Sequence, residues 1–298
     1  MLRFTSFDEL SLRLAPFRTM ASRLITLTTD FGTRDAYVAA MKGVMLDICP
    51  EARFVDITHE ISPQDVMEAA FVLRQAVPYF PADAVHLVVV DPGVGTARRP
   101  VAVQHGAHHY VGPDNGVFPL VLDTSTPSQA IELDREPFWR TTSPSQTFHG
   151  RDIFAPAAAH VAAGQALTEM GSRIDELKPL RWAEPIADAE GLQGWVVHID
   201  RFGNCITNIS RTALAASAPD ATTPDALPPI EAGFKCFVGS TSFTSIHPTY
   251  GDVAEGEPLL LFGSSDFLEV SVNAGNAAEL LDIRKGDSVN LVFNDRAA

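Results

Sequence analysis

The sequence predicts an α/β protein with two domains: an N-terminal α/β/α domain with a mainly parallel sheet, then a smaller all-β barrel domain. In the first half, apolar runs typical of buried strands alternate with segments of helical spacing, the pattern of βα units. In the last third, short strand-like runs are separated by glycine turns, which favours a barrel or sandwich. The 298 residues are enough for two domains of ordinary size.

The pattern divides the chain into four segments. We expect an N-terminal α/β domain over 23–181, a linker over 182–193 and a C-terminal β-barrel domain over 194–298. Residues 1–22 carry scattered charges without the continuous apolar stretch of a secretory signal, so we expect a disordered extension there.

The first ninety residues set out the parallel sheet. Asp35 stands near the start of one helical segment, and Ser62 followed by Pro63 resembles an N-cap with proline at the first helical position. Ligands of such sheets bind beyond the carboxyl ends of the strands, where Asp30 and Asp91 both fall. The expected elements here are strands over 24–29, 52–58 and 84–90 and helices over 35–48 and 62–80.

The remaining elements follow the same signals. "GRDIFAPAAAHVAAG" is typical of a helix that ends at Gly164, and residues 216–233 favour a loose surface loop within the second domain. The other expected strands lie within 99–106, 108–113, 130–134, 194–210, 233–239, 258–275 and 288–294.

Composition excludes several classes of partner. The formal net charge of −15 argues against a nucleic-acid partner, because phosphate binding needs a basic face. No window approaches the roughly 18 consecutive apolar residues of a membrane span, so we expect no membrane association. Cys49, Cys205 and Cys236 form no CxxC pair, which favours buried, reduced thiols in a cytoplasmic protein.

Two polar motifs follow the predicted strands. "VDPGVGTARR" places Asp91 at a strand end, before a glycine turn, but lacks the Gly-Lys-Ser/Thr of a phosphate-binding loop. "TTDFGTRDAY" invites comparison with the calcium site of nucleoside hydrolases, but Thr28 and Arg34 stand where that site has carboxylates, which disfavours a metal. Asp30 then remains as an acceptor for a ribose diol or as a cap of the next helix.

Three further motifs stay ambiguous when read alone. "HGAHHY" (105–110) favours a solvated turn over a zinc site, and His149 in "TFHGRD" precedes a helix, as many structural histidines do. "DRFGNCITNI" (200–209) is compatible with an ordinary β-turn. It also supplies an aromatic face and an amide, the two groups that a purine site needs.

Six motifs occur together and in order, and as a set they resemble the S-adenosyl-L-methionine hydroxide adenosyltransferase family, relatives of the bacterial fluorinase and chlorinase. They are TTDFGT, DPGVGTARR, PDNG, FHGRD, DRFGNCITNI and SSDFLEVSVNAGNAA, and the likeness runs from about residue 24 to 294. The resemblance implies that S-adenosylmethionine and water give adenosine and L-methionine, without metal or other cofactor. It also implies a homotrimer whose active sites lie between one subunit's N-terminal domain and its neighbour's C-terminal domain.

The resemblance also implies the roles of individual residues. The family's catalytic set falls on Asp91, Arg98 and His149. The fluorinase differs at Gln64, where it has an aromatic residue, and at Ser265, where it has arginine. The implied binding residues are Asp30 for the ribose; Phe202, Asn204 and the backbone of Val272, Asn273 and Ala274 for adenine; Asp200 and Ser264 for methionine; and Glu269 on the strand leading to the adenine segment.

The chemistry separates hydrolysis from its alternatives. Methionine already leaves as a neutral thioether, so the difficult steps are activating a water and aligning it with C5′. Arg98 would position Asp91 and favour its charged form, and His149 would orient the water or share its proton. The halogenating relatives have tyrosine where Asp91 stands, and a carboxylate would repel a halide. A halogenase and a non-catalytic adenosine or S-adenosylmethionine sensor remain the alternatives.

Overall fold

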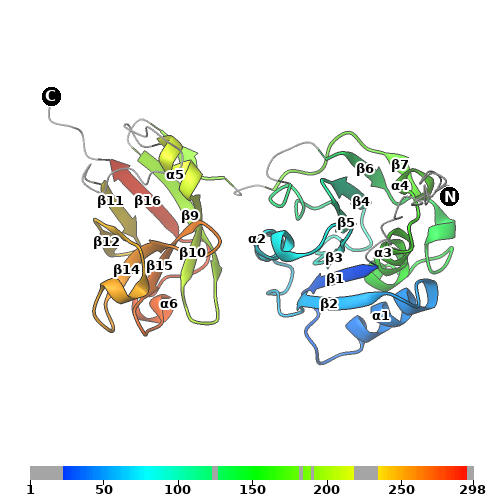
Figure 1. Ribbon diagram of the computed structural model, residues 1–298, viewed down its shortest axis with the longest axis horizontal. Coiled ribbons are helices and arrows are strands. Elements are labelled where there is room, and N and C mark those ends of the chain that lie inside the picture. Colours follow the sequence, from blue (N-terminus) through cyan, green and yellow to red (C-terminus); the bar gives the residue numbers. More distant parts are fainter. Residues whose placement is uncertain (1–22, 123–126, 181–183, 189–190, 218–233, 294–298) are drawn as a thin grey trace, which may run out of the picture.

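The computed structural model describes residues 23–122, 127–180, 184–188, 191–217 and 234–293, with the other segments drawn in grey (Figure 1). The predicted extension over 1–22 and all but the first two residues of the predicted loop over 216–233 lie outside these ranges. The described residues form two sheets, one in each half of the chain.

The N-terminal domain is built on a seven-stranded sheet of order β2-β1-β3-β5-β4-β6-β7. Pairing is parallel from β2 through β1 and β3 to β5, and antiparallel across the remaining strands. The strands are β1 Leu24–Thr29, β2 Arg53–Thr58, β3 Val85–Val89, β4 Pro100–His105, β5 His108–Pro113, β6 Gln129–Glu132 and β7 Ser172–Arg173. The helices are α1 Tyr37–Ile48, α2 Val66–Ala76, η1 Val77–Tyr79, η2 Glu136–Phe138, η3 Gly150–Phe154, α3 Ala155–Ala162 and α4 Leu167–Met170.

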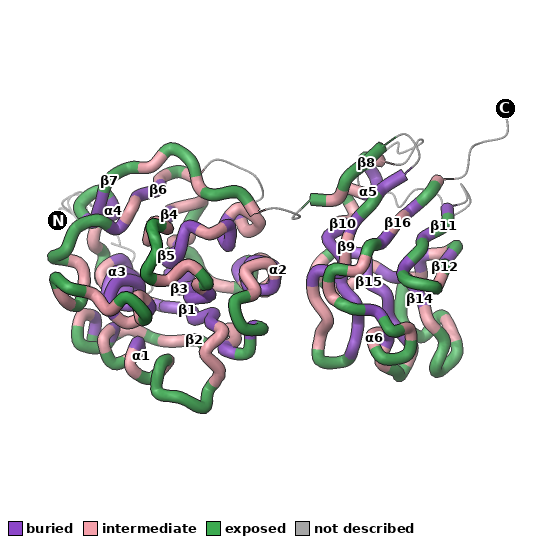
Figure 2. Tube along the Cα trace, turned by 180° about the vertical axis from the view of Figure 1, so that it is seen from behind, coloured by how far each residue is buried: buried purple, intermediate pink, exposed green. Residues whose placement is uncertain are grey.

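Helices cover both faces of this sheet, so the predicted α/β/α layering is present. Met41 and Met45 of α1 pack with the alanine-rich α3 against one face of β1 and β3. Ala70 and Leu73 of α2 pack on the other face, in a second core. Figure 2 shows buried residues along the central strands and on the inner sides of these helices.

Strand register brings the two predicted carboxylates to one edge of the sheet. In the parallel pair β1–β3, Thr29 lies beside Val89. Asp30 and Asp91 follow these strands, so both leave the sheet at its carboxyl edge, the usual place for a ligand in a parallel sheet.

The C-terminal domain is a nine-stranded, nearly closed sheet, as the sequence predicts. Its path is β12-β11-β16-β9-β10-β15-β14-β13, with β8 paired to β9. Buried Leu260, Leu268 and Val270 lie at the centre of its core. Its elements are β8 Ile186–Ala187, β9 Gly191–Ile199, β10 Cys205–Ser210, α5 Arg211–Ser217, β11 Phe234–Val238, β12 Thr241–Phe243, β13 Ile246–His247, η5 Tyr250–Asp252, β14 Pro258–Phe262, β15 Phe267–Val272, α6 Ala277–Leu280 and β16 Ser288–Phe293.

Two helix starts differ from the sequence prediction. α1 begins at Tyr37, after an N-cap without a side-chain hydrogen bond. The Ser62 cap is wrong: α2 begins at Val66, and Asp65 is its N-cap, accepting from the Glu68 N–H at 2.9 Å. The reason is the backbone of Gln64, whose φ of 65° is outside the helical region.

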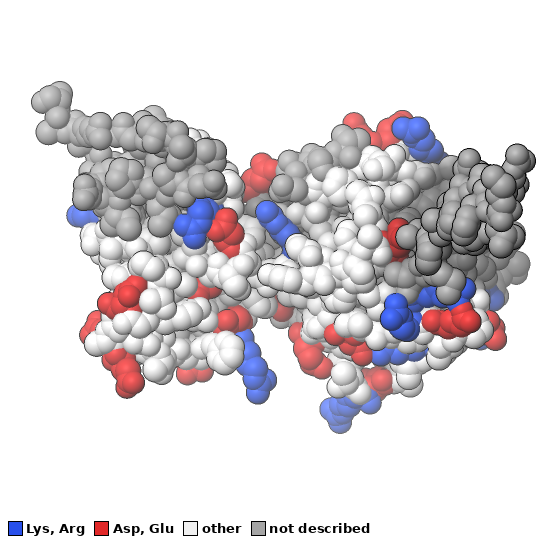
Figure 3. Space-filling model, in the orientation of Figure 1, with Lys and Arg blue, Asp and Glu red and all other residues white. Residues whose placement is uncertain are grey.

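The segment over 182–193, which the sequence predicts to be a linker, contains β8 and the first residues of β9. The two domains contact each other through α2, whose buried Phe71 packs with Val197, Ile206 and Phe267 of the barrel. Figure 3 shows the domains meeting at a waist, with acidic side chains on both of them along the lower edge of this face. Within the described ranges, no helix has the length and apolar character needed to cross a bilayer.

Candidate active site

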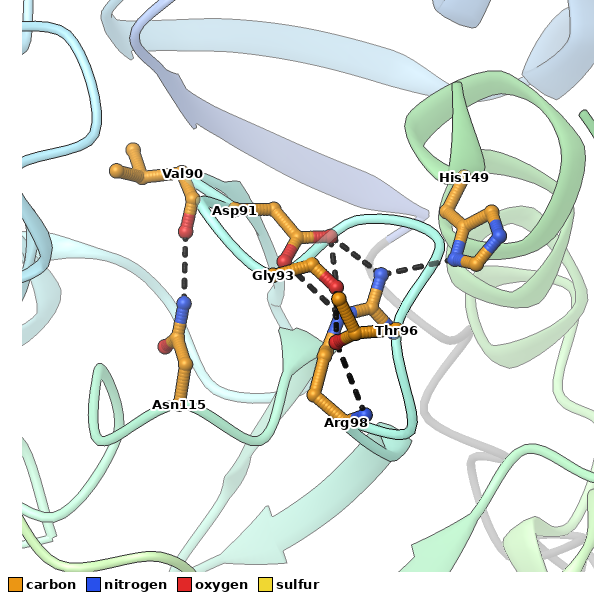
Figure 4. A network of polar contacts seen from close by, with 7 residues as sticks. All are labelled: Val90, Asp91, Gly93, Thr96, Arg98, Asn115 and His149. Carbon is orange, nitrogen blue, oxygen red and sulfur yellow. Dashed lines mark hydrogen bonds and ion pairs between the residues drawn. The ribbon is translucent and has the colours of Figure 1, made fainter. Parts of the chain in front are cut away.

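An aspartate–arginine pair lies at the carboxyl edge of the parallel sheet. The Arg98 Nε donates to both oxygens of Asp91, at 2.9 and 3.0 Å, and Nη2 donates to Oδ2 (Figure 4). The two side chains are only 8% and 6% exposed, so the pair is held away from bulk water. A forked contact of this kind fixes the plane of the carboxylate as well as its position.

The glycine turn between the two residues shapes this pair. Gly95 has a φ of 75°, and a Cβ there would lie 2.4 Å from the Gln146 carbonyl oxygen, so only glycine fits. The Thr96 hydroxyl donates to the Gly93 carbonyl at 2.7 Å and fixes the turn from inside. The Asn115 amide of the "PDNG" motif donates to the Val90 carbonyl at 2.9 Å, which braces the strand end before Asp91.

His149 joins the pair from a distant segment. It precedes the π-helix η3, a wider turn that is often found at functional sites. Its Nδ1 lies 2.9 Å from Nη2 of Arg98 (Figure 4). An arginine N–H only donates, so Nδ1 accepts and the ring proton of a neutral His149 lies on Nε2.

The surroundings of His149 favour its neutral form, and one N–H donor of Arg98 beside it is unpaired among the described residues. Burial, and then the charge of Arg98, lower the pKa of His149 below its usual 6.5. Arg98 lies over the Phe154 ring, with Cζ 4.9 Å from the centroid. The buried Nη1 of Arg98 has no hydrogen-bond partner among the described residues, and is therefore available to a water or a ligand oxygen.

Asp30 stands at the same edge of the sheet and is fixed by another loop. Its Oδ2 accepts from the Gln64 backbone N–H at 2.8 Å. Among the residues that the structure describes, its other oxygen has no hydrogen-bond partner, which suits the predicted role as an acceptor for ribose hydroxyls. The structure thus brings the three predicted catalytic side chains into contact and places Asp30 after the neighbouring strand.

In the barrel, the predicted purine-binding residues share the turn between β9 and β10. Asp200 accepts from the backbone N–H groups of Phe202 and Asn204, both at 2.9 Å, and from the Asn204 amide at 3.0 Å. Gly203 has a φ of 84° and lets this turn close. Phe202 is 75% exposed whereas Asn204 is buried, so the ring projects beside a rigidly held amide.

Glu269 is held by a contact that sequence reasoning missed. The Tyr250 hydroxyl donates to Glu269 Oε1 at 2.5 Å, and the Ser271 hydroxyl donates to the same atom at 3.2 Å. Burial, with a smaller contribution from the charge of Asp200, raises the pKa of Glu269. No local pattern connects Tyr250 with a strand residue 19 positions away, so only the fold reveals this pair.

The remaining predicted binding residues lie along the same strand and its ends. Val272 is buried at the end of β15, Ala274 is exposed with a φ of 56°, and Ser264 is exposed in the turn before that strand. Within the described residues, no hydrogen bond or ion pair joins these barrel residues to Asp91, Arg98 or His149.

The histidine motif at 105–110 forms a tight β4–β5 turn, but one of its rings contacts a buried partner. His86 Nε2 lies 3.2 Å from His108 Nδ1, and His86 Nδ1 lies 2.8 Å from the Thr26 hydroxyl. The described part of the chain contains no cluster of three or more histidine, cysteine or acidic side chains suited to a metal ion. All three cysteines are buried and free, as predicted.

Comparisons with known proteins agree with this architecture. A (R)-S-adenosyl-L-methionine hydrolase from Salinispora tropica is 41% identical over 273 residues, covering 90% of this chain and 97% of its own. A crystal structure of an uncharacterized conserved protein from Thermotoga maritima superimposes with a TM-score of 0.78 at 35% identity, covering 90% of this chain and 99% of that one. A fluorinase from an Actinoplanes species is 29% identical over 297 residues, covering 90% and 97%. Family models for the N- and C-terminal domains of SAM hydroxide adenosyltransferases match residues 25–171 and 194–290, and the chain belongs to that family.

Proposed function

We propose that this protein hydrolyses S-adenosyl-L-methionine to adenosine and L-methionine, and that the R epimer at sulfur is its substrate. The observation that carries the proposal is the contact of Asp91, Arg98 and His149 at the carboxyl edge of the sheet, beside Asp30. The names of its relatives at 35–41% identity support both the reaction and the epimer.

In the proposed reaction, a water oxygen attacks C5′ in line with the C5′–S bond. As the new C–O bond forms, the electron pair of the C5′–S bond goes to sulfur and L-methionine leaves as a neutral thioether. The water proton passes to a carboxylate. No redox step occurs, and a good leaving group needs no Lewis acid, so we propose that neither metal nor other cofactor takes part.

The geometry supports Asp91 as the proton acceptor. His149 Nδ1 is occupied by Arg98, and its Nε2 carries a proton, so the ring can orient a water but is not poised as a base. Asp91 is fixed by Arg98 and retains lone pairs for the water. The unpartnered Nη1 of Arg98 would then donate to the water oxygen or to the new 5′-hydroxyl.

Hydrolysis is favoured over halogenation. A chloride 4 Å from the Asp91 carboxylate would meet a repulsion of about 4 kcal/mol at an effective dielectric constant near 20, before compensation by Arg98. A water, in contrast, donates a hydrogen bond to that carboxylate. The hydrolase relatives at 35–41% identity are also closer to this chain than the fluorinases at 28–29%.

Product analysis tests the reaction. The protein is incubated with S-adenosylmethionine, with and without chloride or fluoride, and the products are separated by chromatography. Equal amounts of adenosine and methionine, independent of halide, support hydrolysis. A 5′-halo-5′-deoxyadenosine product would show a halogenase, and tight binding without methionine release over hours would show a sensor.

For the assembly, we propose a homotrimer in which the barrel of a neighbouring subunit completes each site. We call the predicted catalytic residues with Asp30 the N-terminal half-site, and the predicted binding residues of the barrel the barrel half-site. The Phe202 ring is exposed, and within the described residues each half-site forms its own separate set of hydrogen bonds, which supports this arrangement. Free, buried thiols fit a reducing compartment, so we also propose a cytoplasmic location.

Subunit mixing tests the shared site. Asp91→Asn would inactivate the N-terminal half-site, and Asn204→Ala would inactivate the barrel half-site. Equal amounts of the two inactive proteins, unfolded and refolded together, should regain about a quarter of the wild-type activity, because that fraction of random pairings joins two intact halves. If each site lies within one chain, the mixture should stay inactive.

A further inference from the structure

The barrel contacts the N-terminal domain through a lysine. Lys285 Nζ donates to Asp65 Oδ2 and, at 3.1 Å, to Glu68 Oε2. The three side chains are 29%, 24% and 12% exposed, so this cation lies between two partly buried carboxylates of the other domain. α2, which carries Glu68, is the helix of the N-terminal domain that faces the barrel in both views (Figures 1 and 2).

Lys285 projects from a rigid part of the barrel. Its turn precedes β16 and is bound to β9 by two backbone hydrogen bonds: Gly286 N–H donates to the Val196 carbonyl at 2.8 Å, and Val196 N–H donates to the Asp287 carbonyl at 2.9 Å. The apolar contact of Phe71 with Phe267, whose ring centroids are 5.2 Å apart, lies in the same interface. Lys285 therefore has a fixed place on the barrel, so its contact with Asp65 and Glu68 depends on where the barrel lies relative to α2.

On the other side of the bridge, the carboxylates shape the loop before α2. Asp65 Oδ1 caps the helix through the Glu68 N–H, and Asp65 N–H donates to the Ser62 carbonyl at 3.0 Å. Glu68 Oε2 accepts from the Ser62 N–H at 3.4 Å. The Glu68 carboxylate is thus bound to the loop over 62–65, and Asp65, the last residue of that loop, ties it to α2 through its own carboxylate.

The same loop fixes the predicted ribose ligand. Gln64 precedes Asp65 and has a φ of 65°, a conformation that a glutamine rarely adopts without support. In that conformation its N–H donates to Asp30 Oδ2 at 2.8 Å. A displacement of Asp65 would therefore move the neighbouring Gln64 N–H, and with it the hydrogen bond that holds Asp30.

We infer that Lys285 is a positioning residue for substrate binding: it holds Asp65 and Glu68, which keep Gln64 in its left-handed conformation and so aim Asp30 at the ribose. This inference rests on the proposed role of Asp30. It adds the requirement that the barrel contact the N-terminal domain of the same chain for Asp30 to take up its ribose-binding orientation.

The test compares ligands with and without the ribose hydroxyls. Calorimetric titration of the full-length protein with adenosine and with 2′,3′-dideoxyadenosine gives the affinity of each variant. Lys285→Met should weaken adenosine binding about fivefold, the scale of coupling within one ion-pair network, and leave dideoxyadenosine binding unchanged. Lys285→Arg should restore the affinity, because arginine keeps the charge.

The matched control is Arg284→Met in the same turn. The Arg284 side chain is 78% exposed and, among the described residues, pairs only with Asp282 of its own domain, at 3.1 Å, so its loss should leave both affinities unchanged. If Lys285→Met folds poorly, Asp65→Asn breaks the same bridge while keeping a good N-cap, and should show the same ribose-specific loss.

A double-mutant cycle with Asp30→Asn decides the route. If Lys285 acts through Asp30, adding Lys285→Met to Asp30→Asn should cause no further loss of adenosine affinity. Additive losses, or equal weakening of both ligands by Lys285→Met, would overturn the positioning role while leaving Asp30 as the ribose ligand. Wild-type adenosine affinity in Asp30→Asn would instead remove the proposed ribose contact, and the inference with it.

Discussion

Replacing Asp91 with asparagine is the sharpest test of the proposed chemistry. Asparagine keeps the shape and one acceptor oxygen for Arg98, but it removes the carboxylate that we propose as the proton acceptor for the attacking water. Loss of a positioned proton acceptor typically lowers kcat by about 10² to 10⁴. Because Asp91 is proposed for chemistry rather than binding, the affinity for adenosine should change little.

The structural cost of this substitution must be separated from the catalytic loss. The Asp91 side chain is 6% exposed, so its replacement leaves the Arg98 charge without its full partner. A poorly satisfied buried group of this kind costs about 2 kcal/mol of unfolding free energy. A protein of this size should remain folded, and thermal melting with size-exclusion chromatography verifies that it does.

The chain offers a matched control in the next arginine. Arg99 donates to Asp114 through Nε at 2.9 Å and Nη2 at 2.5 Å, and the Asp114 side chain is 5% exposed. Asp114→Asn should therefore have a similar cost in stability, while kcat stays within about threefold of wild type. Adenosine formation is measured by chromatography at saturating substrate. Retention of more than about a tenth of wild-type kcat by Asp91→Asn, or an equal loss in Asp114→Asn, would refute the reasoning.

Three further predictions follow from the site and the core. Because the pKa of His149 lies below 6.5, kcat should fall only as the pH drops through that lowered value and Nδ1 gains a proton; a pH–rate profile in which His149→Gln keeps the same acid limb would contradict this. Burial lowers the pKa of His86 to about 3, so the neutral ring stabilises the fold above pH 6.5 and this stability is lost as the pH falls. Urea unfolding should show about 2 kcal/mol lost by pH 5, and His86→Gln should remove that part of the pH dependence. Gly95→Ala should lower the free energy of unfolding by about 1–2 kcal/mol in thermal melting. It should also lower kcat, because the turn that carries Asp91 and Arg98 must move away from Gln146, and a wild-type kcat would contradict this.

The sequence predicts those parts of the site that depend on strand order. Asp30 and Asp91 each follow an apolar run, and parallel pairing of neighbouring strands brings such residues to one edge without further information. The barrel turn at Asp200 is also local, since its hydrogen bonds span only two to four residues. Both features follow from short-range pattern and general rules of sheet construction.

Contacts across the fold could not be predicted in this way. Ser62 has good N-cap chemistry, but the Gln64 N–H is engaged by Asp30, 34 positions earlier, and the helix starts later as a result. The contact of His149 with Arg98 spans 51 residues, and its basis in the sequence was the family resemblance rather than any local pattern. The bridge from Lys285 to Asp65 spans 220 residues and has no signature in either segment.

The proposed catalytic groups match the way charge moves during the reaction. The substrate begins with a positive charge on sulfur, and as water attacks C5′ that charge is transferred to the incoming oxygen. A carboxylate near the sulfonium would stabilise the bound substrate more than the transition state, whereas a carboxylate beside the water stabilises the transition state more. Asp91 meets that requirement only if its charge is aimed at the water. The forked contact of Arg98 fixes the orientation of the carboxylate, and the neutral His149 adds no second cation beside the oxygen on which the charge would arrive.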